Sequence, residues 1–274
     1  MRTVVADLTL VRPTSLDDAL RRLRSGAVTP IAGFTDVGVA MNFGTLTDNA
    51  FLDLTTLSGG RLSEIVVESD VLFIGALATY SQIIHSAAVR DRLPMLIDAA
   101  RQVGGVQIQN RGTIGGNIAN GSPAGDTLPV LAAANAVLVL TSVDGDRRVP
   151  FVNFYTGYRK SVLRPDEIIT AVQVPRIEGR QWFRKVGTRA AQAISKLVIA
   201  AVRSPTPAIA LGSVAPTVVR APRTEAALSS GAPIQEAARI LREEIVPIDD
   251  LRSTASYRRV VAANLLEQFW SETA

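Results

Sequence analysis

The sequence predicts an α+β protein in which helices and strands follow one another in three successive groups. Hydrophobic residues make up 47% of the 274 residues, which is enough to bury a sizeable core in two or three subdomains. Apolar residues recur at helical spacing in some segments and as short strand-like runs in others, with glycine and proline between them. We therefore expect subdomains at residues 1–57, 58–175 and 176–274.

The first group begins with an amphipathic helix. Ser15 and Asp18 have the spacing of a capping box, and Gly26 is placed to end the helix. The buried stripe of this helix is predicted to consist of Leu16, Ala19, Leu20 and Leu23. A strand entered from Val28, a turn at Gly33, a helix at 37–41 and a strand at 51–54 complete the group.

The second group mixes strands and helices around a long glycine-rich loop at 111–126. The predicted strands are 62–68, 71–74, 137–140 and 168–174, and the predicted helices are 81–89, 93–103 and 128–134.

The third group follows a boundary at 175–179, where proline and glycine interrupt the pattern. Strands at 182–186, 197–202 and 208–214 are predicted to form a meander, and helices are predicted at 224–229, 234–245 and 255–270.

Composition excludes several kinds of chemistry. The chain has no cysteine, so it cannot hold an iron–sulfur cluster by thiolates or use a cysteine nucleophile. His85 is the single histidine, and its amphipathic helix favours a surface or structural role over catalysis. We predict no metal site and no catalytic side chain, and any redox cofactor must be organic.

Charge and hydropathy indicate an ordinary globular protein. The net charge of +4 comes from 29 basic and 25 acidic residues, and Arg21, Arg22 and Arg24 form a solvated helix face rather than a nucleic-acid site. The apolar stretch 128–140 is interrupted and too short to span a bilayer. Residues 1–5 lack the apolar core of an export leader, so a cytoplasmic location is expected.

The segment 111–126 is the most informative part of the chain. It combines closely spaced glycines with Asn117, Asn120 and Asp126. Glycines let bare backbone approach a ligand, and successive amides can bind phosphate oxygens. A nucleotide pyrophosphate is the simplest ligand for such a loop.

A second glycine loop, residues 31–38, leads into a helix that Thr35 or Asp36 is placed to cap. It is neither GxGxxG nor a P-loop, so a Rossmann or kinase-type site has little support. Each loop alone is compatible with a plain turn, but the two together indicate a nucleotide site.

In their order and separation, the two loops resemble the flavin-binding motifs of the FAD subunit of molybdenum hydroxylases. That family includes the flavin domain of xanthine dehydrogenases and the medium subunit of carbon monoxide dehydrogenases. The resemblance covers nearly the whole chain, and 113–126 is its most specific part. Further similar segments are 13–20, 74–76, 183–188, 193–196 and 208–221.

The resemblance implies an FAD-binding fold of the vanillyl-alcohol oxidase type, with FAD extended between subdomains 1–57 and 58–175 and a C-terminal domain at 176–274 beside it. The positions that match the family's cofactor contacts are Ile31, Ala32, Gly33, Phe34, Thr35, Asp36, Val103, Thr113, Ile114, Gly115, Gly116, Asn117, Asn120, Asp126, Ile169 and Lys185. Lys185 matches the lysine near the isoalloxazine ring. Phe34 departs from the family, which commonly has glycine or asparagine there.

The implied function is electron transfer. In such complexes a large subunit with a molybdenum cofactor oxidises the substrate, a small subunit carries two iron–sulfur clusters, and FAD passes the electrons to NAD+, dioxygen or another acceptor. Two alternatives stay open: a stand-alone FAD-dependent oxidoreductase of the same broad fold, and a non-enzymatic module that binds another nucleotide.

Overall fold

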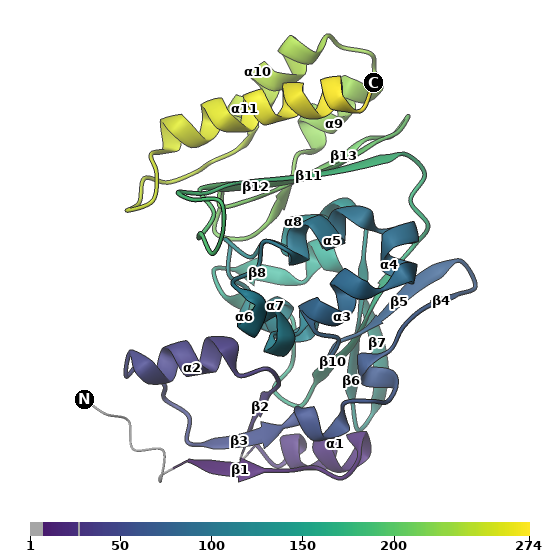
Figure 1. The fold of residues 1–274 in the computed structure, drawn as a ribbon, viewed down its shortest axis with the longest axis vertical. Coiled ribbons are helices and arrows are strands. Elements are labelled where there is room, and N and C mark those ends of the chain that lie inside the picture. Colours follow the sequence, from purple (N-terminus) through teal and green to yellow (C-terminus); the bar gives the residue numbers. More distant parts are fainter. Residues whose placement is uncertain (1–7, 27) are drawn as a thin grey trace.

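The computed structural model describes residues 8–26 and 28–274 and confirms the α+β class. The residues on which the leader prediction rests, 1–5, lie outside this range. Figure 1 shows an elongated molecule with the N-terminal strands at one end, the C-terminal helices at the other, and the second group between them. Within the described ranges, no helix combines the length and apolarity needed to cross a membrane.

The N-terminal group is a small parallel sheet with two helices. Its elements are β1 (Thr9–Val11), α1 (Leu16–Arg24), β2 (Thr29–Ile31), α2 (Thr35–Asn42), β3 (Ala50–Asp53) and a 3-10 turn at Leu54–Leu57. The strand order is β1-β3-β2. The amide of Asp18 donates to Ser15 Oγ at 3.1 Å, and Gly26 at φ 73° follows the helix, so both predicted ends of α1 are confirmed. Leu20 and Leu23 pack with Leu52 in a core of their own.

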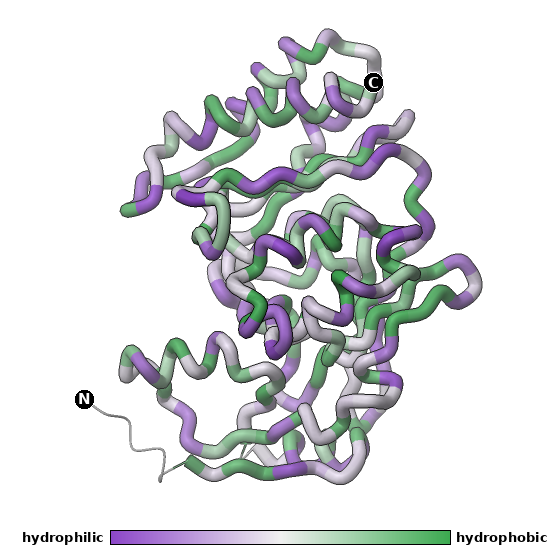
Figure 2. Tube along the Cα trace, viewed as in Figure 1, coloured by the Kyte–Doolittle hydropathy of each residue, from purple (hydrophilic) through white to green (hydrophobic). Residues whose placement is uncertain are grey.

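The second group is built around an antiparallel sheet in the order β4-β5-β10-β6-β7. Its elements are a 3-10 turn at Arg61–Ser63, β4 (Ile65–Glu68), β5 (Val71–Gly75), α3 (Tyr80–His85), α4 (Ala87–Arg92), α5 (Pro94–Ala100), α6 (Val106–Arg111), α7 (Ile114–Asn120), α8 (Leu128–Ala133), β6 (Val137–Ser142), β7 (Gly145–Pro150), a 3-10 turn at Phe151–Asn153, β8 (Tyr155–Gly157), β9 (Lys160–Ser161) and β10 (Ile168–Val174). Figure 2 shows the apolar run along β4 and β5, broken by the polar turn between them.

The C-terminal group is an antiparallel meander, β11-β12-β13-β14, covered on its outer face by three helices. Its elements are β11 (Arg180–Val186), β12 (Leu197–Arg203), β13 (Ala208–Gly212), β14 (Val219–Arg220), α9 (Pro222–Ser229), α10 (Ile234–Glu244) and α11 (Ala255–Glu272).

Strand β12 explains how the second and third groups are joined. Alternate side chains of a strand point to opposite faces. Leu197 and Ile199 pack in the core under α10 and α11, whereas Val198 and Ala200 pack in the central core with α5 and α8. The strand is therefore buried on both sides, which accounts for its unbroken apolar sequence.

The predicted loop at 111–126 is wrong in its first half, because residues 114–120 form helix α7. Thr113 caps it by accepting the Gly116 amide at 3.1 Å, and Ile114 and Ile118 are fully buried. Gly115 allows close packing, since a Cβ there would lie 2.7 Å from Ala76. Tertiary packing thus overrides the low helix propensity of glycine.

Other differences are local. The predicted helix at 81–89 is divided at Ser86, which ends α3 and caps α4 through the amide of Val89. Elements that were not predicted are β1, α6, β7, β8, β9 and β14. His85 is exposed and donates through Nδ1 to the Ser81 carbonyl at 2.7 Å, in line with a structural role.

Candidate functional site

A cleft of about 970 Å³ is lined by residues from all three groups. Its volume lies at the upper end of the range for small-molecule and cofactor sites. The lining from the first two groups consists of Asp36, Val39, Val103, Asn117, Asn120, Ser122, Pro123, Ala124, Gly125, Asp126, Tyr158 and Arg159. The C-terminal group contributes Ala193, Ile194, Ser195, Ser213, Ala215, Pro216, Ile248, Asp250, Arg252 and Arg258.

The first glycine loop presents free backbone amides at the start of α2. The amides of Phe34, Thr35, Asp36 and Val37 donate no hydrogen bond to any other described residue. Such amides, together with the helix dipole, attract an anion. The prediction that Thr35 or Asp36 caps α2 is wrong, because Phe34 occupies the cap position, at φ 65° and without a side-chain hydrogen bond.

Gly33 brings the two glycine segments into contact. A Cβ built on Gly33 would lie 1.9 Å from the carbonyl oxygen of Arg111 and 3.0 Å from Cα of Gly112. Only a residue without a side chain fits here, so Gly33 fixes the approach of the first loop to the chain that enters α7.

The amides of the second glycine segment are used within the protein. The amide of Ile114 donates to the Ala78 carbonyl at 3.0 Å and that of Gly115 to the Ala76 carbonyl at 2.8 Å. The amide of Gly116 donates to the side chain of Thr113, and the amide of Asn117 donates to the Thr113 carbonyl. The amides of residues 114–117, where a cradle was expected, are thus not free for a ligand, because they cap α7 or bond to the segment that follows β5.

Side chains of this segment, rather than its backbone amides, are available to a ligand in the cleft. Asn117 and Asn120 line the cleft from α7. Asn117 Oδ1 accepts from Thr127 Oγ1 at 2.7 Å, which orients the amide group. Asn120 Nδ2 donates to Asp36 Oδ1 at 3.0 Å and so joins α7 to α2 across the cleft.

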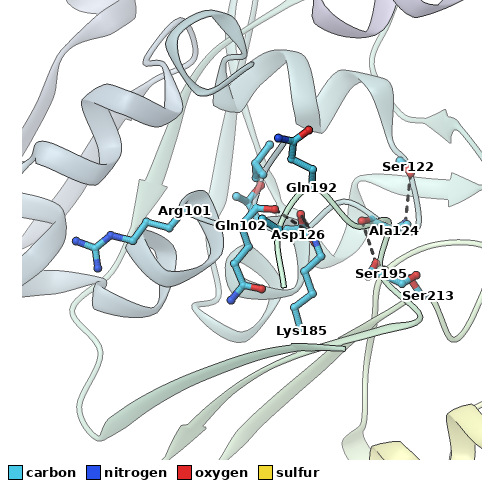
Figure 3. Close-up of polar contacts among 12 residues, drawn as sticks. Arg101, Gln102, Ser122, Ala124, Asp126, Lys185, Gln192, Ser195 and Ser213 are labelled. Atoms are coloured by element: carbon cyan, nitrogen blue, oxygen red, sulfur yellow. Dashed lines mark hydrogen bonds and ion pairs between the residues drawn. The ribbon is translucent and has the colours of Figure 1, made fainter. Parts of the chain in front are cut away.

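Lys185 and Asp126 form a buried ion pair where the second and third groups meet (Figure 3). Lys185 Nζ lies 2.7 Å from Asp126 Oδ2 and donates to the Gln102 carbonyl at 3.0 Å. Burial raises the pKa of the Asp126 carboxyl to about 6, and Lys185 opposes that rise. Asp126 Oδ1 is buried and has no hydrogen-bond partner among the described residues.

The loop before α8 is held to the C-terminal group by further contacts. Ser195 Oγ donates to the Ala124 carbonyl at 3.2 Å and lies 2.9 Å from Ser213 Oγ (Figure 3). The amide of Ser213 donates to the Pro123 carbonyl at 2.8 Å. One wall of the cleft is therefore assembled from both groups.

The predicted site residues divide into three sets. The cleft itself is lined by Asp36, Val103, Asn117, Asn120 and Asp126. Ile31, Thr113, Ile114, Gly115 and Ile169 are buried, and Ala32, Gly33, Phe34, Thr35 and Gly116 are partly exposed near the start of α2 or within α7. Lys185 instead lines an adjoining cavity of about 80 Å³ with Gln102, Arg189 and Gln192.

Three arginines were missed. Arg159 lies in the turn between β8 and β9 at φ 51°, forms no ion pair among the described residues, and lowers the pKa of Asp36 against the raising effect of burial. Arg252 and Arg258 line the cleft from the C-terminal group. None of them belongs to a glycine motif, so only the fold brings them to the site. The described part of the chain holds no cluster of three or more metal-binding side chains.

Two protein families match the chain over nearly its whole length. The FAD binding domain in molybdopterin dehydrogenase matches residues 6–177, and the CO dehydrogenase flavoprotein C-terminal domain matches residues 182–273. The chain therefore belongs to the family of FAD-binding subunits of molybdopterin dehydrogenases. This membership confirms the resemblance, the FAD cofactor and the oxidoreductase class.

Individual relatives agree. The chain is 31% identical over 224 residues to the carbon monoxide dehydrogenase medium chain of Hydrogenophaga pseudoflava, covering 76% of each protein. It is 32% identical over 186 residues to the glyceraldehyde dehydrogenase medium chain of Sulfolobus acidocaldarius, covering 67% of this chain and 66% of that one. The structure of carbon monoxide dehydrogenase from Hydrogenophaga pseudoflava superposes with a TM-score of 0.90 at 28% identity, covering 97% of this chain and 98% of that chain.

Proposed function

We propose that this protein is the FAD-containing electron-transfer subunit of a heteromeric molybdenum hydroxylase. The observation that carries the proposal is a cleft lined both by Asp36 and Val39 of α2, the helix whose first amides are free, and by Asp126, which pairs with Lys185. An extended dinucleotide has an anionic centre and a polar ring, so it needs both features. Residues 1–57 and 58–175 would hold the cofactor between them, with 176–274 alongside.

The fit to FAD rests on unsatisfied groups. The free amides of Phe34 to Val37, and Arg159, which forms no ion pair among the described residues, suit the pyrophosphate. Asn117, Asn120 and Asp36 suit ribose or ribityl hydroxyls. The orphaned Asp126 Oδ1 can accept a hydrogen bond from the cofactor, which would relieve an otherwise costly buried acceptor.

The flavin supplies the redox chemistry, and the chain supplies position and charge. Lys185 is fixed by two hydrogen bonds, and its side chain is 5% exposed, so its ammonium cannot turn away into solvent. A fixed cation beside the ring stabilises negative charge that develops on reduction. The neighbouring cavity lined by Gln102, Arg189 and Gln192 gives room beside it.

The remaining parts of the proposal concern partners. Electrons would arrive from a small subunit with 2Fe-2S clusters, substrate oxidation would occur on a large subunit with the molybdenum cofactor, and NAD+ or another acceptor would take the electrons from FAD. The medium-chain names of the relatives support a multisubunit enzyme. This chain has no thiolate with which to hold a cluster, so the electron donor must be another protein. A cytoplasmic location is proposed with it.

The test separates flavin binding from turnover. The purified chain should show the blue absorption of bound flavin at a stoichiometry near one, and it should not oxidise purines, aldehydes or N-heterocycles with artificial acceptors. Co-expression with its large and small partners should yield a molybdenum-containing complex that turns over. Substrate-dependent turnover by the FAD-loaded chain, with molybdenum shown to be absent, would instead establish a stand-alone flavoenzyme.

A further inference from the structure

The Asp126–Lys185 pair is enclosed but incompletely bonded. Asp126 is 8% exposed, and Oδ2 faces Lys185 Nζ at 2.7 Å while Oδ1 has no partner among the described residues. Lys185 has one further contact, the Gln102 carbonyl. Burial disfavours the charged form of the Asp126 carboxyl, and the neighbouring ammonium favours it.

The nearby charged and titratable groups come from three elements and one loop. Lys185 stands on β11, Arg189 follows β11 beside the small cavity, Tyr80 begins α3, and Asp36 lies in the first turn of α2. Among the described groups, Lys185 is the one whose charge acts appreciably on the Asp126 carboxyl. Tyr80 is buried, and that burial, with the charges of Asp36 and Asp126, raises its pKa far above neutrality, so it does not compete for protons.

Asp126 can nevertheless exchange protons with solvent. It lines the large cleft that Asn120, Ser122 and Arg159 also line, whereas Lys185 lies behind it in the smaller cavity. Figure 3 shows the lysine rising from its strand to meet the carboxylate. The carboxylate is thus the member of the pair on the side of the proposed cofactor and of water.

We propose that Asp126 is the proton acceptor that balances the charge gained when FAD in this cleft is reduced, with Lys185 as the positioning cation that keeps it ionised beforehand. The inference rests on the proposed function, because it requires FAD in the cleft. It adds a proton-coupling role for this carboxylate.

The balance of the step is simple. If bound FAD were to gain two electrons from an iron–sulfur donor, or from dithionite in a titration, together with one proton, the cofactor would carry one additional negative charge. That charge disfavours the neighbouring carboxylate, so Asp126 takes a proton from water in the cleft and becomes a neutral acid. The ammonium of Lys185, no longer neutralised by Asp126, would then add a full positive charge behind the carboxyl group.

This proton uptake depends on a pKa of the Asp126 carboxyl just below neutrality. The Asp126 carboxyl has a pKa of about 6 before the electrons arrive, so it is mostly ionised at pH 7. A negative charge that appears nearby raises the pKa of Asp126 further. At a pH between the pKa of Asp126 before reduction and its higher pKa after reduction, two protons accompany two electrons. Below pH 6, Asp126 is already protonated and contributes no proton.

The test is the pH dependence of the flavin midpoint potential in the FAD-loaded chain. One proton per two electrons shifts the potential by about 30 mV per pH unit, and two protons shift it by about 59 mV. Asp126→Asn should lower the slope just above pH 6 by the contribution of one proton, about 30 mV per pH unit. The control Glu167→Gln changes a buried carboxylate paired with Arg147 outside the cleft, and it should leave the slope unchanged.

A second measurement uses the wild-type protein as reference. The infrared difference spectrum between oxidised and reduced protein at pH 7 should show a new protonated-carboxyl band that is missing in Asp126→Asn. A wild-type spectrum without that band, or equal slopes in wild type and Asp126→Asn, would overturn the proton role even if the variant loses some flavin. Failure of the chain to bind FAD at all would refute the proposed function instead, and the flavin content measured first distinguishes the two.

Discussion

Gly33→Ala tests the contact between the two glycine segments. The added Cβ would lie 1.9 Å from the Arg111 carbonyl oxygen and 2.5 Å from its carbonyl carbon. Both are backbone atoms, so no rotamer change relieves the clash. The start of α2 must therefore move by about 1 Å away from the chain that enters α7, the two elements that Asn120 and Asp36 connect across the cleft.

The expected loss of FAD affinity follows from that displacement. Overpacking against an unyielding neighbour costs about 1–3 kcal/mol. A protein without flavin can relieve the strain by letting α2 move, but binding requires the original arrangement, so the cost appears in the affinity. At 1.4 kcal/mol per tenfold, we expect the dissociation constant for FAD to rise by about 5- to 150-fold.

Gly38→Ala is the matched control. It lies one helical turn further along α2, and its Cβ would meet only ring atoms of Phe34, at 3.5 and 3.6 Å. Alanine in a helix interior is favoured over glycine by about 0.5–1 kcal/mol, so this variant should be at least as stable as the wild type. Affinity is measured by titrating apo-protein with FAD and following flavin fluorescence, and stability by urea unfolding. Equal affinities in Gly33→Ala and Gly38→Ala would refute the argument.

Three further predictions concern Phe34, Asp250 and Lys185. Phe34→Asn should raise the unfolding midpoint by the equivalent of about 1 kcal/mol, because asparagine tolerates φ 65° better than phenylalanine; a lower midpoint would show that the ring packing on α2 outweighs the backbone strain. Hydrogen bonds from Arg258 and from two backbone amides lower the pKa of Asp250 to about 2. Its ionisation therefore stabilises the fold above about pH 4, and this stabilisation is lost as the pH falls towards 2. Because Asp250 is exposed and solvent screens its contacts, Asp250→Asn should cost only about 1 kcal/mol at pH 7 and nearly nothing at pH 2 in urea unfolding. Lys185→Met should lower the flavin potential at pH 7 by about 30 mV for each 1.4 kcal/mol of lost stabilisation, and an unchanged potential would place this lysine away from the ring.

The elements that could be predicted are those whose buried residues recur in a regular sequence pattern. Helix α1 follows from its cap and apolar stripe, and β12 from its unbroken apolar run. Strand β7 was missed because its GDRRVP sequence is that of a polar edge strand, with neither alternation nor an apolar run. Helix α7 was missed because its glycines serve a close contact with Ala76 that local propensity does not reveal.

Prediction of the site had a similar limit. The family resemblance grouped Asp36, Asn120 and Asp126 through the two glycine segments, and in the structure all three line one cleft. The resemblance could not tell which amides remain free, because that depends on whether a segment is helical and on which carbonyls lie beside it. Arg159 and Arg258 come from a distant turn and from the last helix, so only the assembled fold reveals them.

The central position of β10 has a consequence for synthesis of the chain. Its neighbours in the sheet are β5, which begins roughly a hundred residues before it, and β6, which begins roughly thirty residues before it. During translation both neighbours leave the ribosome with an unpaired edge, and the gap between them closes only after Val174 has emerged. Nascent chains that stop before this residue should be retained by chaperones, and those that extend beyond it should become resistant to protease over the first two-thirds of the protein.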